Sequence, residues 1–399
     1  MTALTLRLLW VALGPDITLS DAASYDNLAA RLSRGMGYVR SWGNPVPTAY
    51  RPPGYPMFLA LLYAIFGRHH WVVGIAQATM GMMSCLLLYS LAAGLLGGRK
   101  GRLAGLALAV YPNHIYYASL VMSETLFVTL MLVALWMLAR RPPFRASHLL
   151  VAGIAAGLSA LVKPNAILLW VLAAAWLIAT ERGPRRAAKV LVFVLPLAAI
   201  ISAWTLRNIQ AMGAPILIST NGGVNFYIGN HQGATGAYHF PSDNPVLAFT
   251  SELERQRQGY RLGIEFIRSH PAQWLLLVPR KILWLVLGEA DGVRWGFGDT
   301  PWPGGKPHVI ILGAIATLAY WPLLLLGLAG MVRLGFRSRR GLLLSLVPIS
   351  WVITHVMFFG GPRFHFSLIP IFALFAATCG NHCTKKRESL LAGVQDKDE

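Results

Sequence analysis

The chain has 399 residues, 55% of them hydrophobic and 13% charged, which excludes a water-soluble globular fold and indicates an integral membrane protein. Because a helix needs about 20 apolar residues to cross a bilayer, this length permits roughly ten crossings and a sizeable loop. The formal net charge of +19 does not indicate nucleic-acid binding, since clusters of Lys and Arg border apolar runs, as in cytoplasmic loops. These clusters lie at 99–102, 140–145, 182–189, 333–340 and 385–387.

The first predicted element is an apolar stretch at 3–13, which is too short to cross a bilayer alone. We interpret it as the end of a first transmembrane helix whose beginning is missing or short. A polar loop at 14–70 follows, and helical spacing of its apolar residues predicts an amphipathic helix at 21–33 behind Ser20 as N-cap. A second short apolar helix is predicted at 54–66.

Nine candidate spans come after this loop, and together with the first helix they predict an all-α polytopic membrane protein with about ten transmembrane helices. If the basic clusters are cytoplasmic, the large loops at 14–70 and 207–272 both lie outside the cytoplasm. The predicted spans are 71–97, 103–118, 122–139, 149–162, 166–180, 190–208, 309–332, 342–359 and 364–380.

The region between the sixth of these nine spans and the seventh contains a large polar loop and an apolar segment. The second outer loop contains an Asn- and Gly-rich run at 220–230 and ends in a polar helix near 246–268. The apolar segment 273–289 would break the alternation of the basic loops if it crossed, so we expect a helix that lies in the membrane interface. Residues 1–383 then form one transmembrane domain, and 384–399 form a polar cytoplasmic tail.

Ionisable residues beside the apolar helices gather on the outer side of this predicted topology. A charge at such a position is costly unless it is used, and a shared outer cavity explains the set. Asp21, at the start of an amphipathic helix, is favoured in its ionised form and suits a general base, although an ordinary first-turn acid is the alternative. The set is Asp21, Arg51, Glu124, Lys163, Arg207 and Arg363.

The roles of the other five residues follow from their chemistry. Glu124 follows Ser123 at a helix start, where it is either a second functional acid or a capping-region acid. Arg51, Lys163, Arg207 and Arg363 would suit phosphate oxygens at the headgroup level, although each alone could be a snorkelling side chain. The run at 220–230 could present backbone N–H groups to an anion or a sugar, or form plain turns.

A series of short motifs resembles the bacterial branch of the GT-C membrane glycosyltransferases, which includes dolichyl-phosphate-mannose protein mannosyltransferases and the lipid A aminoarabinose transferase. The resemblance covers nearly the whole chain and depends on the order of the motifs and their outer positions. The motifs are Asp21-x-x-x-Tyr25, Gly35-x-Gly37-Tyr38, Arg51-Pro-Pro-Gly-Tyr-Pro56, Ser123-Glu124-Thr-Leu-Phe127, Trp204-x-x-Arg207-Asn208, Thr220-Asn-Gly-Gly223, Gly229-Asn230 and Arg363-Phe-His-Phe-x-x-x-Pro370.

The resemblance implies roles for particular residues. Asp21 would be the catalytic base, Arg51 would contact the lipid phosphate, and Glu124 would be the second outer acid. Tyr50 precedes Arg51 where the aminoarabinose transferase has a glutamate, so the sequence does not support a divalent metal, and we expect no cofactor. The residues expected to contact the sugar or the acceptor are Tyr25, Tyr55, Asn221, Asn225 and Asn230.

The sequence therefore predicts a transferase of the bacterial inner membrane, with its site on the extracytoplasmic face and its C-terminus in the cytoplasm. It would use a polyprenyl-phosphate sugar donor and a lipid, glycan or protein acceptor, with inversion at the anomeric carbon. Two alternatives remain open at this point. One is a transporter or flippase of a lipid-linked saccharide, and the other is an O-antigen polymerase or ligase.

Overall fold

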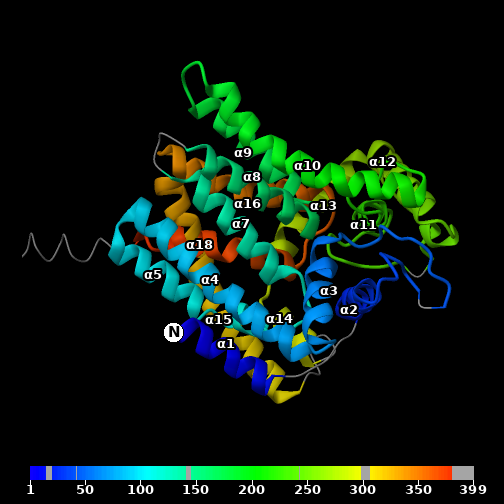
Figure 1. The fold of residues 1–399 in the computed structure, drawn as a ribbon, viewed down its shortest axis with the longest axis horizontal. Coiled ribbons are helices and arrows are strands. Elements are labelled where there is room, and N and C mark those ends of the chain that lie inside the picture. Colours follow the sequence, from blue (N-terminus) through cyan, green and yellow to red (C-terminus); the bar gives the residue numbers. More distant parts are fainter. Residues whose placement is uncertain (15–19, 42, 141–144, 242, 298–305, 380–399) are drawn as a thin grey trace, which may run out of the picture.

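The computed structural model describes residues 1–14, 20–41, 43–140, 145–241, 243–297 and 306–379. Within these ranges the chain is built from helices, and extended pairing is limited to two isolated bridges, Val39 with Pro47 and Ala237 with Gly360 (Figure 1). The all-α fold class predicted from the sequence is thereby confirmed. The predicted tail at 384–399 lies outside the described residues.

Four helices are long and apolar enough to cross a membrane, and shorter apolar helices pack beside them. The long ones are α4 (His70–Leu96), α10 (Arg186–Met212), α15 (Pro307–Gly330), which continues through a π-helical turn η2 (Met331–Gly335), and α16 (Arg339–Met357). The shorter ones are α1 (Thr2–Leu13), α3 (Gly54–Phe66), α7 (Glu124–Leu138), α8 (Ala146–Val162), α9 (Ala166–Thr180), and the run α17 (Pro362–His365), η3 (Phe366–Leu368) and α18 (Ile369–Ala376).

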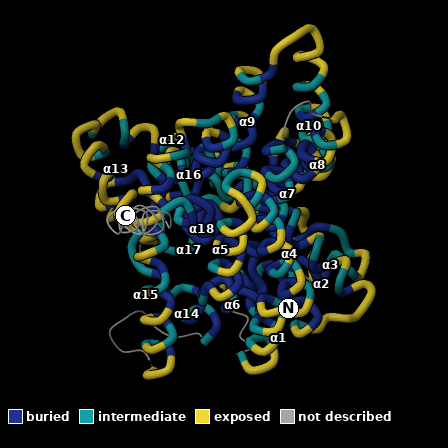
Figure 2. The backbone as a smooth tube through the Cα atoms, turned by 90° about the vertical axis from the view of Figure 1, so that its left-hand side faces the viewer, coloured by how far each residue is buried: buried dark blue, intermediate teal, exposed yellow. Residues whose placement is uncertain are grey.

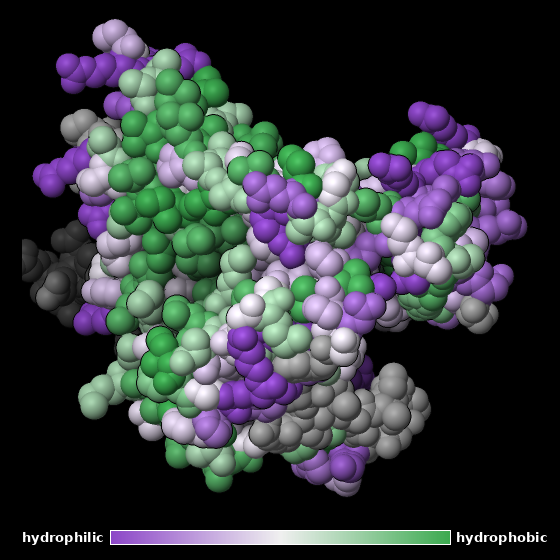
Figure 3. Space-filling view, turned by 45° about the vertical axis from the view of Figure 1, so that its right-hand side comes forward, coloured by the Kyte–Doolittle hydropathy of each residue, from purple (hydrophilic) through white to green (hydrophobic). Residues whose placement is uncertain are grey.

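Large apolar side chains from distant parts of the chain form one main core. Phe127, Trp170, Trp351 and Phe375, from α7, α9, α16 and α18, are each at most 1% exposed and belong to it. Figure 2 shows the buried residues concentrated around α18, with exposed residues on the outer helices. Figure 3 shows a broad hydrophobic surface bordered by hydrophilic residues, as expected for helices that face lipid.

One predicted span is wrong. The segment 103–118 is not a single helix, because α5 (Gly98–Ala109) ends before Tyr111 and a separate short helix, α6 (Pro112–Tyr116), follows. Tyr111 has an extended backbone, with φ −67° and ψ 118°. A residue that precedes proline is disfavoured in the helical conformation, so Pro112 accounts for the break.

The amphipathic helix predicted at 21–33 is α2 (Ser20–Ser33), and the helix predicted at 54–66 is α3. The segment 273–289, which is predicted to lie in the membrane interface, corresponds to α13 (Pro271–Val286), which exposes Leu275, Leu276 and Leu283. Part of the Asn- and Gly-rich run is helical. The remaining elements are α11 (Gly222–Gly229), η1 (Pro245–Ala248), α12 (Glu252–Ser269) and α14 (Asp291–Phe297).

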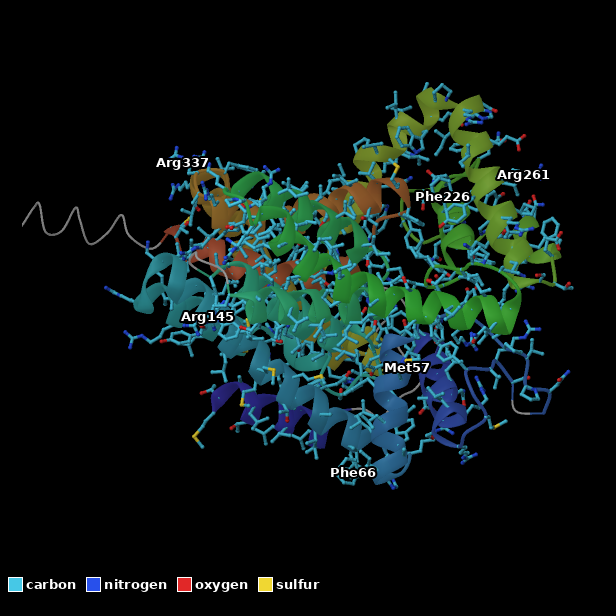
Figure 4. All side chains as sticks on the ribbon, turned by 45° about the horizontal axis from the view of Figure 1, so that its top comes forward. Met57, Phe66, Arg145, Phe226, Arg261 and Arg337 are labelled. Atoms are coloured by element: carbon cyan, nitrogen blue, oxygen red, sulfur yellow. The ribbon has the colours of Figure 1, made fainter. Side chains whose placement is uncertain are left out.

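The two large loops meet at one end of the bundle, and two of the basic loops lie at the other end. Figure 4 places Phe226 and Arg261 at the right and Arg145 and Arg337 at the left, and α2, α11 and α12 lie at the right in Figure 1. This separation is the arrangement that the charge pattern predicts, and the two large loops are in contact through residues 48–49 and Glu252.

Glu252, the first residue of α12, joins the two loops. Its carboxylate accepts hydrogen bonds from the hydroxyls of Thr48 and Thr220, at 2.6 and 3.1 Å, and from the backbone N–H of Ala49 at 3.2 Å. Bonds to a charged group are stronger than neutral ones, so this carboxylate holds the segment just before Arg51 in place.

Candidate active site

A continuous series of ion pairs lies where the first outer loop meets the ends of three helices. Arg51 Nη2 donates to Asp21 Oδ1 at 2.5 Å, and Arg363 Nη1 donates to Asp21 Oδ2 at 2.6 Å. Arg363 Nε also donates to Glu124 Oε1 at 2.6 Å, and Lys163 Nζ donates to the same oxygen at 2.9 Å. We call these five residues the ion-pair chain.

Five different elements supply the five side chains. Asp21 is in the first turn of α2, Glu124 begins α7, and Lys163 directly follows α8. Arg363 is in the four-residue helix α17. Arg51 precedes α3, and its carbonyl accepts a hydrogen bond from the hydroxyl of Tyr38 at 2.9 Å. The ion-pair chain therefore exists only in the folded protein, since its members come from five separate segments.

The ion-pair chain is more open at one end than at the other. The side chains of Asp21, Arg51 and Arg363 are 22%, 17% and 17% exposed, whereas Glu124 is fully buried. Glu124 Oε2 has no hydrogen-bond partner although it is buried. Three cations face two carboxylates, so the site carries one excess positive charge and attracts an anion that approaches from the Asp21 end.

The two arginines control the protonation of Asp21. Burial alone raises the pKa of this carboxyl, but the charges of Arg363 and Arg51 and their hydrogen bonds outweigh burial and lower the pKa to about 2. Asp21 is therefore ionised at neutral pH, as the sequence predicts. Both of its oxygens are occupied by arginines, however, so its basicity is low while these pairs persist.

Aromatic rings line the open end. The guanidinium of Arg51 lies 5.4 Å from the ring centroids of both Tyr25 and Tyr50. Tyr25 packs edge-to-face on Tyr55, with ring centroids 5.2 Å apart. Tyr55 is itself fully buried and donates to Gln77, so it supports Tyr25 from behind. Of the two predicted sugar-contacting tyrosines, Tyr25 contacts Arg51 of the ion-pair chain, whereas Tyr55 packs on Tyr25 and Phe58.

Arg207 lies apart from the ion-pair chain. Its guanidinium donates to the backbone carbonyls of Tyr38 and Thr48, each at 2.8 Å, and lies 4.9 Å from the ring centroid of Trp204. These contacts tie α10 to the first outer loop. The structure therefore places Arg207 beside the first large loop and Trp204, and its phosphate-binding role stays a prediction.

The three predicted asparagines occupy different surroundings. Asn230 is fully buried and fills its hydrogen-bonding capacity with Phe226, Met357, Trp274 and Lys281. Its amide thus joins the second loop to α13 and α16. Asn221 precedes α11 and Asn225 lies within it, and both are partly exposed.

The sequence predicts no role for two buried residues near the ion-pair chain, although one of them, His365, lies in the motif that begins at Arg363. Glu289 follows α13, and His365 lies two residues after Arg363; both are fully buried and hydrogen-bonded to each other. The available signal was a carboxylate at the end of an apolar run, where a charge is costly. Among the described residues, no group of three His, Cys, Asp or Glu side chains is arranged to hold a metal ion.

Apolar helices around a buried chain of ion pairs define a membrane protein with a charged site in its interior. Residues 50–206 match the family described as dolichyl-phosphate-mannose-protein mannosyltransferase. The matched range includes Arg51, Glu124 and Lys163, but it ends before Arg363 and begins after Asp21. This match confirms the resemblance predicted from the motifs.

The structure is similar to that of the oligosaccharyltransferase from Archaeoglobus fulgidus. The apo form gives a TM-score of 0.55 at 14% identity, covering 98% of this chain and 51% of that chain. The form tethered to an acceptor peptide gives 0.54 at 15% identity, covering 94% and 48%. This chain thus spans about half the length of the oligosaccharyltransferase, and the likeness concerns the fold.

ArnT from Cupriavidus metallidurans, solved with undecaprenyl phosphate bound, gives a TM-score of 0.43 at 15% identity, covering 94% of this chain and 75% of that chain. No curated protein sequence matches the chain.

Proposed function

We propose that the protein is a membrane glycosyltransferase that moves a sugar from a polyprenyl-phosphate donor to an extracytoplasmic lipid, glycan or protein acceptor. The observation that carries this proposal is Asp21 held between Arg51 and Arg363 at the accessible end of the ion-pair chain. A carboxylate beside a cationic site for phosphate is what transfer from a phosphate leaving group requires. The family match at 50–206 supports the same reaction class.

The reaction can be written with its atoms and electrons balanced. A hydroxyl or amine of the acceptor attacks the anomeric carbon, and its proton passes to Asp21. The new bond forms as the bond from the anomeric carbon to the phosphate oxygen breaks, and that oxygen keeps the electron pair. Arg51 and Arg363 stabilise the charge on the departing phosphate, so no general acid is needed. Attack opposite the leaving group inverts the anomeric carbon.

Donor binding would also activate the base. The cations that hold Asp21 are those that would bind the phosphate, so phosphate oxygens compete with the carboxylate for the guanidinium groups. Losing these bonds and gaining an anionic neighbour both raise the pKa of Asp21 from about 2 towards the range of an effective base. The donor would then bind before the acceptor is deprotonated.

A panel of donors tests the reaction class. Purified protein in lipid nanodiscs is supplied with polyprenyl-phosphate hexoses and pentoses and with a membrane extract as acceptor, and products are identified by mass spectrometry. We expect one donor to be consumed with release of polyprenyl phosphate. Transport of the intact donor across the vesicle membrane, without release of polyprenyl phosphate, would show that the protein is a flippase and not a transferase.

The site is proposed to face the extracytoplasmic side of a bacterial inner membrane, with the C-terminus in the cytoplasm. Single cysteines are placed at Arg261, Arg145 and Ala392 after Cys85, Cys379 and Cys383 are changed to Ser. An impermeant maleimide should label the Arg261→Cys protein in intact cells, and should label the other two only after lysis, because basic loops remain in the cytoplasm. Labelling of the Arg145→Cys protein in intact cells would show that the orientation is opposite to the one proposed.

A further inference from the structure

A second buried cluster lies behind Arg363. Its centre is Glu289, which is fully buried and whose Oε1 accepts hydrogen bonds from the hydroxyl of Tyr111 at 2.7 Å and from the amide of Asn113 at 3.0 Å. The other oxygen, Oε2, is hydrogen-bonded to Nε2 of His365. Asn113 Oδ1 in turn accepts from the backbone N–H of Gly292 at 3.1 Å.

The bonds of His365 define where its protons lie. Its Nδ1 lies 2.8 Å from the carbonyl oxygen of Leu285, and a carbonyl oxygen only accepts, so Nδ1 carries hydrogen. Nε2 faces Oε2 of Glu289, so one proton joins the ring to the carboxyl group, while Tyr111 and Asn113 donate to Oε1. The arrangement is therefore a fully buried, hydrogen-bonded His–Glu pair. The ring of Tyr320 stacks on His365, with centroids 4.5 Å apart.

His365 shares the four-residue helix α17 with Arg363. Residues two apart on a helix point in opposite directions, so His365 faces inward while Arg363 faces Asp21 and Glu124. Helix α17 is thus held by polar contacts on both of its sides. Glu289 also joins it to Tyr111 and Asn113, and Asn113 bonds to the start of α14, so this carboxylate is one of the groups that fix the position of α17, beside the bonds of Trp351 and Leu285 to it.

We infer that Glu289 and His365 are positioning residues, which hold α17 so that Arg363 presents its guanidinium to the donor phosphate. This inference rests on the proposed function of Arg363 as a phosphate ligand. Neither residue touches the ion-pair chain directly, so Glu289 acts through His365 and α17. Loss of the pair displaces Arg363, and a charge-assisted contact is sensitive to such displacement.

A double-mutant cycle tests this inference. The dissociation constant of undecaprenyl phosphate is measured in nanodiscs for the parent, Glu289→Gln, Arg363→Ala and the double variant. We expect Glu289→Gln to weaken binding about tenfold in the parent but less than about twofold in the Arg363→Ala background, because residues that act as a unit are not additive. Equal weakening in both backgrounds, or no weakening in the parent, would overturn the positioning role.

The same cycle separates this inference from the proposed function. If Arg363→Ala leaves binding unchanged, the phosphate-site proposal fails and the positioning role fails with it. If Arg363→Ala weakens binding and Glu289→Gln does not, only the positioning role fails. Should Glu289→Gln not fold, Tyr111→Phe takes its place in the cycle, since it removes a single bond to Glu289; it should act in the same direction with a smaller effect.

A matched control accounts for general destabilisation. Glu181 is a buried carboxylate that is paired with Lys189. It follows the C-terminal end of α9, whereas Lys163 lies before the N-terminal end of the same helix. Glu181→Gln removes a buried charge in the same way as Glu289→Gln but should change the dissociation constant by less than about twofold. If Glu181→Gln weakens binding as much as Glu289→Gln does, the effect of Glu289 is a general loss of stability and the inference is overturned.

Discussion

Replacing Asp21 with Asn should reduce sugar transfer by about 10²–10⁴-fold, because the substitution removes a general base but hardly changes volume. Expression and membrane insertion should be unaffected. The amide no longer neutralises Arg51 and Arg363, so affinity for the donor phosphate should be kept or should increase. The transfer rate should therefore fall, while donor affinity measured on the same preparation stays the same or rises. Near-normal turnover by Asp21→Asn would show that Asp21 is not the general base.

The pH dependence of the parent enzyme provides a check on the same residue. The pKa of Asp21 is lowered to about 2 in the protein without donor. The value of kcat/KM for the donor reports the free enzyme, so it should show no acid limb from this group above pH ~4. With donor bound, competition for the arginines raises the pKa, and kcat should fall as pH decreases through that higher value. Profiles of kcat and kcat/KM with the same apparent acid limb would contradict activation of the base by the donor.

Replacing Arg363 with Ala should have the second-largest effect. Arg363 is the one member of the ion-pair chain that contacts both carboxylates, so its loss leaves Asp21 with Arg51 and Glu124 with Lys163. A charge-assisted bond contributes about 1.5–3 kcal/mol, so donor affinity should fall at least about tenfold. Because Glu124 is fully buried, thermal stability should fall as well.

Two comparisons define the cause of this effect. Arg363→Lys retains the charge but lacks the planar fork, so it should also weaken donor binding. Arg261 is an exposed arginine of α12 at the same end of the molecule, bonded to Gln258, and Arg261→Ala should leave donor affinity within about twofold (Figure 4). If Arg261→Ala weakens binding as much as Arg363→Ala does, the effect is one of overall charge and not of the fork.

The sequence alone determined the helical fold, the two large loops and the end of the bundle where charges gather. These properties depend on local composition: lipid requires continuous helices, cytoplasmic loops collect Lys and Arg, and a charge beside an apolar helix is costly. That is why α2 and α3 were predicted closely, and why five of the six outer charged residues lie in one chain of contacts. The break at Tyr111 was missed, because the apolar run continues across Pro112.

Tertiary structure decided which charges are partners. Asp21 and Arg363 are 342 positions apart, and Glu124 and Arg363 are 239 apart, so no spacing rule connects them. Arg207 has the same side chain as Arg363, yet it donates to backbone carbonyls because α10 passes beside the first outer loop. Glu289 and His365 are joined only where α13 and α17 meet. A buried charge must find a partner among the groups that packing brings near, and packing is a property of the whole chain.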